Sequence, residues 1–238
     1  NYLLQYTMTY NKDFSPNVKL NAVAGTTYEE FNNRSFFVGI DDFPTDILLT
    51  NNLGLGNVET VTLGSNKNKN TLLSYLVRAN LTLFDKFLFT SSFRADGSSR
   101  FGENNKYGYF PSAALAYQLG KENFIPDFIS NLKIRTSYGV TGNQEIGNFA
   151  SLSTFALGSQ AILGGSPFQG TAATRIANPD LKWESTTQAD LGLDLGLFKE
   201  RIQVSMDYFF KKTDDLLLNL PIPTSSGFNS ILRNVGSL

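Results

Sequence analysis

A strict alternation of apolar and polar residues, repeated along most of the chain, limits the possible folds more than any other feature of this sequence. It is clearest over residues 189–197, where Ala or Leu at every second position alternates with Asp or Gly. Successive side chains of a β-strand point to opposite faces, so such a segment is typical of a strand with one apolar and one polar face. The sequence therefore predicts an all-β fold.

The same alternation predicts eight strands and the beginning of a ninth. They cover residues 2–10, 18–28, 72–84, 87–95, 112–119, 132–140, 189–197 and 202–210, and the ninth begins near Ile231. Tight turns are expected at Asp85-Lys86 and Lys199-Glu200, and long loops over 31–70 and 141–179. Short and long connections then lie at opposite ends of an antiparallel, up-and-down meander.

Composition argues against several functions. The 238 residues include no Cys and no His, which excludes disulfides and thiolate metal sites and removes the commonest general base. Positive and negative charges are mixed along the chain and sum to −1, which argues against a nucleic-acid partner. We therefore expect no enzyme, no catalytic residues, no cofactor and no metal.

Strand length separates two all-β architectures. Strands of soluble β-sandwiches are usually about 5–6 residues long, whereas tilted strands of about 9–11 residues cross a bilayer. Most of the predicted strands have the longer length, and their polar faces carry Gln, Asp, Arg, Asn, Thr and Gly. This pattern favours a transmembrane antiparallel β-barrel with a polar lumen and a lipid-facing apolar band. Such a sheet must close without edges, so further strands are expected before Asn1 and after Leu238.

Five segments together resemble the barrel signatures of SusC/RagA-type TonB-dependent outer-membrane transporters. They occur in the family's order, at residues 93–102, 107–112, 132–143, 178–184 and 213–218. One departure is Tyr117, where the family often has Trp. The resemblance implies a large plugged barrel of about 22 strands, of which residues 1–238 form a part with about eight to nine strands.

The resemblance also implies a function and partners. In this family an N-terminal plug fills the lumen, a short motif contacts TonB, and a SusD-like surface lipoprotein covers the barrel as a lid. We expect active import of an oligosaccharide or peptide across the outer membrane, with the long loops outside the cell and outer-membrane lipid around the wall. The plug, the TonB-contacting motif and the C-terminal strands are expected outside this chain.

Eight charged residues are the candidate lumen residues, facing cargo or plug. They are Arg78, Arg94, Asp96, Arg100, Arg135, Asp190, Asp194 and Asp207. Around Asp96-Gly97-Ser98-Ser99 we favour a structural ion-pair turn, because Gly adopts positive φ and Asp bonds nearby backbone. For the three later aspartates we favour a solvated pore lining over a paired acid/base site. Arg78, Lys133 and Arg135 are expected to balance those acids across the wall.

Two further features leave alternatives open. Trp183 could stack on a sugar ring, but we favour an interface anchor or a role in the fold. The Gly-rich segment 158–170 lacks the spacing of a phosphate-binding loop, and we interpret it as a surface loop that could touch cargo or lid.

The other hypotheses for the whole chain are a passive porin-like channel and a soluble carbohydrate-binding β-domain. Extraction separates the last of these from a barrel, because a barrel requires detergent.

Overall fold

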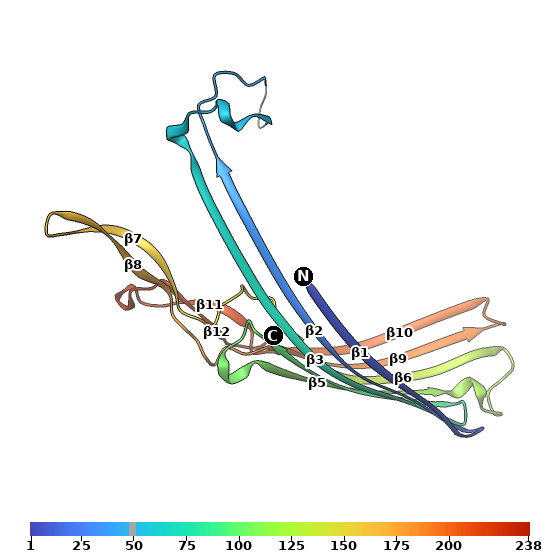
Figure 1. Cartoon of the computed structure of the whole chain (residues 1–238). Helices are drawn as coiled ribbons and strands as arrows, with labels where there is room; N and C mark the ends of the chain where they lie inside the picture. Colours follow the sequence, from blue (N-terminus) through green and yellow to red (C-terminus); the bar gives the residue numbers. More distant parts are fainter. Residues whose placement is uncertain (48–50) are drawn as a thin grey trace.

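The computed structural model describes residues 1–47 and 51–238, and most of them form one antiparallel sheet (Figure 1). The sheet has eight strands in the order β1-β2-β3-β4-β5-β6-β9-β10. Their bounds are β1 (Tyr2–Ser15), β2 (Val18–Gly39), β3 (Thr62–Leu83), β4 (Phe87–Ser98), β5 (Tyr107–Gln118), β6 (Ile129–Asn143), β9 (Glu184–Leu197) and β10 (Ile202–Asp214). The sheet is open, with β1 and β10 at its edges, as expected for a segment of barrel wall. The predicted all-β meander is confirmed.

Two small hairpins stand apart from this sheet. They are β7 (Thr154–Leu163) with β8 (Ser166–Arg175), and β11 (Leu217–Pro221) with β12 (Ser230–Asn234). The first occupies much of the predicted loop 141–179, including the Gly-rich segment 158–170. The strand predicted near Ile231 exists as β12, but it pairs with β11 and is not a ninth strand of the sheet. No helix among the described residues is long or apolar enough to span a membrane.

Strands β2 and β3 are far longer than predicted. Their pairing runs without a bulge from Val18 and Leu83 to Gly39 and Thr62. The predicted loop 31–70 is therefore wrong at both of its ends, over 31–39 and 62–70, and residues 48–50 of it lie outside the described part. Backbone pairing needs no apolar face, so the hairpin continues where alternation with apolar residues has ended.

The predicted turn at Asp96-Gly97-Ser98-Ser99 is also wrong, because β4 continues through Ser98. Gly97 has a different role from the one expected. A Cβ on Gly97 would lie 2.7 Å from the ring of Tyr107, its partner on β5. Glycine is needed here for close packing of a tyrosine ring rather than for a bend.

The tight turns lie at one end of the sheet and the long connections at the other (Figure 1). β1–β2, β3–β4 and β9–β10 are joined by short turns, whereas β2–β3, β4–β5 and β6–β9 are joined by longer segments. Two of the tight turns use positive φ at residues other than glycine, namely Phe84 and Asp85 at 54°, and Phe198 at 54°. The short turns and the longer connections are segregated as predicted, except that the β5–β6 connection, residues 119–128, lies at the end of the tight turns.

One face of the sheet is apolar and exposed. Tyr6, Tyr75 and Tyr109 lie in one row across β1, β3 and β5, near the long connections. Near the tight turns, Phe87 stacks on Tyr117 with ring centroids 4.4 Å apart. Aromatic rows therefore border the apolar face at both ends, which is typical of a surface covered by lipid.

Candidate luminal site

The opposite face is polar, and an ion-pair network spans three of its strands. Arg135 of β6 binds Asp194 of β9 through two bonds, Nε to Oδ2 at 2.8 Å and Nη2 to Oδ1 at 3.0 Å. The same Nη2 donates to Oδ1 of Asp207 on β10 at 3.0 Å. Ser205 donates to the Asp194 carboxylate from β10. One guanidinium thus compensates two carboxylates.

A glycine makes this network possible. Gly192 lies between Arg135 and Asp207 in the same cross-strand row. A Cβ on Gly192 would lie 2.6 Å from Asp207 Oδ1 and 2.8 Å from Arg135 Cζ. The absence of a side chain on β9 therefore lets Arg135 extend across one strand to the next.

Asp190 is held separately on the same face. It accepts hydrogen bonds from the hydroxyl of Ser137 at 2.9 Å and from the side-chain amide of Gln188 at 2.7 Å. Both oxygens of the carboxylate are bonded within the wall. The three aspartates do not form a paired acid/base site, because Asp194 shares a cation with Asp207 and Asp190 is bonded to neutral groups.

Arg94 and Asp96 form an ion pair nearer to the long connections. Arg94 Nε lies 2.7 Å from Asp96 Oδ2, and its Nη2 donates to Ser74 Oγ at 3.0 Å. Asp96 is 7% exposed, and among the described residues its Oδ1 has no hydrogen-bond partner. The pair is set into the wall along β4.

Arg100 and Arg78 do not join either network. Arg100 lies beyond β4 and donates to Asn148 Oδ1 at 3.1 Å and to the Gln144 carbonyl at 3.2 Å, so it ties two loops together. Arg78 is exposed on the polar face of β3, opposite Ser92, and makes no ion pair within the described part of the chain. Of the cations expected to balance the aspartates, Arg135 is the one that contacts them.

A ladder of polar side chains across β1 to β4 was not predicted. Asn21 donates to Asn11, Asn80 donates to Asn21 at 3.0 Å, and Thr90 donates to Asn80 at 2.9 Å. These residues occupy one row of the register. The sequence places Asn21, Asn80 and Thr90 on polar faces, whereas Asn11 lies beyond the predicted end of the first strand. Their alignment depends on strand pairing that alternation alone does not specify.

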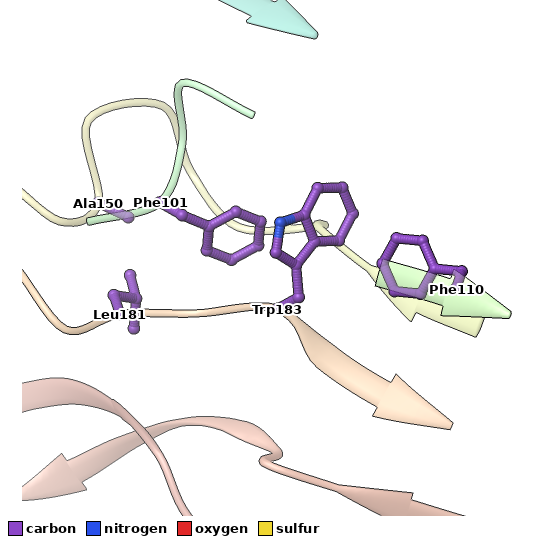
Figure 2. Packing of buried hydrophobic residues seen from close by; sticks show 5 residues of the cluster. All are labelled: Phe101, Phe110, Ala150, Leu181 and Trp183. Carbon is purple, nitrogen blue, oxygen red and sulfur yellow. The ribbon is translucent and has the colours of Figure 1, made fainter. Parts of the chain in front are cut away.

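The buried apolar residues gather among the loops beyond the sheet. Trp183, 8% exposed, packs between Phe101 and Phe110, with centroid distances of 4.9 Å and 5.3 Å (Figure 2). Leu181 and Ala150 complete the cluster. The indole N–H of Trp183 donates to the Lys106 carbonyl at 3.0 Å. Trp183 is therefore buried within the protein and has a role in the fold, which is one of the two favoured interpretations.

Asn234 of β12 fastens the second small hairpin to this cluster. Its Oδ1 accepts from the Lys182 backbone N–H at 2.9 Å, and its Nδ2 donates to the carbonyls of Lys182 at 2.7 Å and Asp215 at 3.0 Å. Asn178 adds a bond to the Leu232 carbonyl at 2.9 Å. The connection that precedes β9 is thus bound to the segment that follows β10.

These features define a class of protein. On β3 the apolar face extends from Leu73 to Leu83, or roughly 33 Å at about 3.3 Å per residue. A strand tilt of about 40° reduces this to about 25 Å along the membrane normal, the height of the apolar band of outer-membrane barrels. The fold and its two faces are those of the wall of a membrane β-barrel with a polar, hydrogen-bonded lumen.

The chain belongs to the β-barrel family of TonB-dependent receptors. The model of the family described as "TonB dependent receptor-like, beta-barrel" matches residues 1–238. The "TonB-dependent receptor P3" of Formosa agariphila is 40% identical over the whole chain, which covers 24% of that protein. The "TonB-dependent receptor SusC" of Bacteroides thetaiotaomicron is 42% identical over 71% of the chain and 18% of its own length. The chain thus spans about a quarter or less of the curated relatives it matches.

Solved structures agree with this assignment. The "RagAB peptide transporter" superposes with a TM-score of 0.87 at 28% identity, covering 99% of this chain and 26% of the RagAB chain. The same values hold for the RagAB peptide importer in its 'open-open' state. The resemblance to SusC/RagA-type outer-membrane transporters is confirmed.

Proposed function

We propose that this barrel wall serves a TonB-dependent importer that carries oligosaccharides or peptides across the outer membrane. The observation that carries the proposal is the structural similarity of the whole chain to a RagAB peptide transporter. Its sequence, 42% identical to SusC over 71% of the chain, supports the same proposal. Transport makes and breaks no covalent bond, so no catalytic residue is assigned. The wall contributes a lipid-facing apolar band and a polar lumen.

The proposed partners follow from the same two similar proteins, RagAB and SusC. A SusD-like lipoprotein covers the barrel from outside, TonB supplies energy from the inner membrane, and lipid surrounds the apolar face. The long connections and the two small hairpins lie on the outer side, and the tight turns on the periplasmic side. The polar face lines the path of the cargo, with Arg78, Arg94, Asp96, Arg135, Asp190, Asp194 and Asp207 along it and Arg100 among the loops at its outer end.

Uptake by whole cells tests this proposal. Cells expressing the full transporter with its lipoprotein are supplied with labelled neutral oligosaccharides and labelled short peptides, with and without a functional TonB. Accumulation of one class of cargo that requires both the transporter and TonB is the expected result. Accumulation that persists without TonB would overturn active import in favour of a passive channel, and extraction of the protein without detergent would overturn the barrel itself.

A further inference from the structure

The β2–β3 hairpin continues beyond the apolar band and rises above the rest of the sheet (Figure 1). Because its pairing has no bulge, the face that lines the lumen at Asn21 and Asn80 continues unbroken to Gly39 and Thr62. Above Glu29 this face has five cross-strand rows without any charged residue. Seven of its side chains form what we call the neutral strip: Phe31, Asn33, Ser35, Phe37, Asn66, Asn68 and Asn70.

Charges on this part of the hairpin lie on the opposite face. Arg34 pairs directly with Lys67, and Lys69 lies in the preceding row and forms an ion pair with Glu30 at 2.9 Å. The two faces of one hairpin therefore differ in chemistry, one neutral and the other charged. Solvation alone does not account for this difference, since most side chains on both faces of this part of the hairpin are exposed.

The amides of the neutral strip are available to a ligand. Within the described part of the chain, Asn33, Asn66, Asn68 and Asn70 make no side-chain hydrogen bond, whereas Asn21 and Asn80 lower on the same face bond to each other. Each carboxamide offers two donors and an acceptor. Such groups suit a partner that carries many hydroxyls, because a hydroxyl both donates and accepts.

Phe37 supplies an uncovered aromatic ring. It is 63% exposed, and its cross-strand partner is Gly64. The far end of the ring lies over another glycine, Gly39, where an added Cβ would be 3.0 Å from Cζ. Phe31, 46% exposed, lies six residues earlier on the same face. The two rings are thus roughly 20 Å apart along the strand, at about 3.3 Å per residue.

We propose that the neutral strip is a binding surface for a neutral oligosaccharide at the outer mouth of the barrel. The C–H faces of sugar rings are apolar and pack on aromatic rings, while sugar hydroxyls pair with the amides between them. The absence of charge favours a neutral glycan over peptides with charged ends or side chains. This inference rests on the proposed function and selects oligosaccharides from its two cargo classes.

Adjacent residues on opposite faces provide a matched test. The full transporter with its lipoprotein, purified in detergent, is titrated with neutral α-glucan, β-glucan, fructan and mannan hexasaccharides, and with a capped neutral hexapeptide of Gly, Ser and Ala. At least one glycan is expected to bind. Phe37→Ala is expected to raise its Kd roughly three- to tenfold. Phe36→Ala, 82% exposed on the other face, should leave it unchanged.

A second pair of variants examines the amides. Asn68→Ala is expected to weaken binding of the same glycan, and Lys67→Ala is not. Binding of the hexapeptide alone, of none of the probes, or of glycans with equal affinity to the Phe36 and Phe37 variants would overturn the inference. TonB-dependent uptake in cells would still be intact in those cases, so failure of this site is distinguishable from failure of the proposed function.

Discussion

Arg135 on β6 contacts Asp207 on β10 across an intervening strand, with Nη2 and Oδ1 3.0 Å apart. Arg135 passes over Gly192 to reach Asp207, and it also bonds to Asp194, the carboxylate closest to it. One guanidinium and one missing side chain therefore connect three strands of the polar face.

Removal of this guanidinium is expected to destabilise the wall. Arg135→Gln leaves Asp194 and Asp207 close together without their shared cation, so the urea midpoint of the full transporter refolded in vesicles should fall. The control is Arg78→Gln, which removes an arginine without an ion pair from the same face. Adding Asp194→Asn to Arg135→Gln should recover part of the loss. Equal midpoints for the two arginine variants would contradict the role given to Arg135.

A methyl group at Gly142 is expected to disrupt the aromatic cluster. A Cβ there would lie 2.1 Å from Phe110 Cζ and 2.9 Å from Trp183 Cε3. Gly142→Ala should cost about 1–3 kcal/mol through overpacking, and should expose the loops to limited proteolysis. Gly147→Ala serves as the control, because nothing lies within 4 Å of its added Cβ. Equal protease sensitivity of the two variants would contradict the packing.

The strands of the wall could be predicted because lipid imposes alternation. Wherever one face must be apolar, as over 189–197, period-two patterning appears in the sequence and the strand is found. The upper parts of β2 and β3 have no such constraint, since most side chains on both of their faces are exposed. Hairpin β7–β8 was missed for the same reason. Apolar and polar residues alternate where one face of a strand contacts lipid, and strands outside the membrane need no such alternation.

The sequence predicted on which face of the sheet the candidate residues lie, but not which residues they contact. The eight charged residues expected at the lumen include seven on strands of the polar face, whereas Arg100 lies in a loop. The connections between them depend on register: Arg135 meets Asp207 because of a row shared with Gly192. A glycine among alternating leucines was visible in the sequence, but its consequence required knowledge of which strands are neighbours.

Asn234 is expected to anchor the β11–β12 hairpin. Asn234→Ala removes three hydrogen bonds and leaves backbone groups of Lys182 and Asp215 without partners. A loss of about 1–3 kcal/mol in local stability follows, so trypsin cleavage at Arg233 should accelerate about fivefold or more. Asn219→Ala, exposed on the same hairpin, is the control. Unchanged cleavage in the Asn234 variant would show that the hairpin is held by other contacts.

Glu122, in the connection between β5 and β6, should make the end of the sheet with the tight turns sensitive to acid. The Lys86 ammonium, 2.9 Å away, and the Tyr117 hydroxyl, 2.8 Å away, hold the pKa of the Glu122 carboxyl below its ordinary value. A lowered pKa means that the stabilisation is complete above the ordinary glutamate pKa of about 4.3. It is then lost as the pH falls through the lower folded-state pKa. The urea midpoints of the parent and Glu122→Gln should therefore differ at pH 7 and converge towards pH 3.

Glu103→Gln, exposed beyond β4, should show no such convergence. A difference between parent and Glu122→Gln that stays constant over this range would rule out the ion pair as its cause.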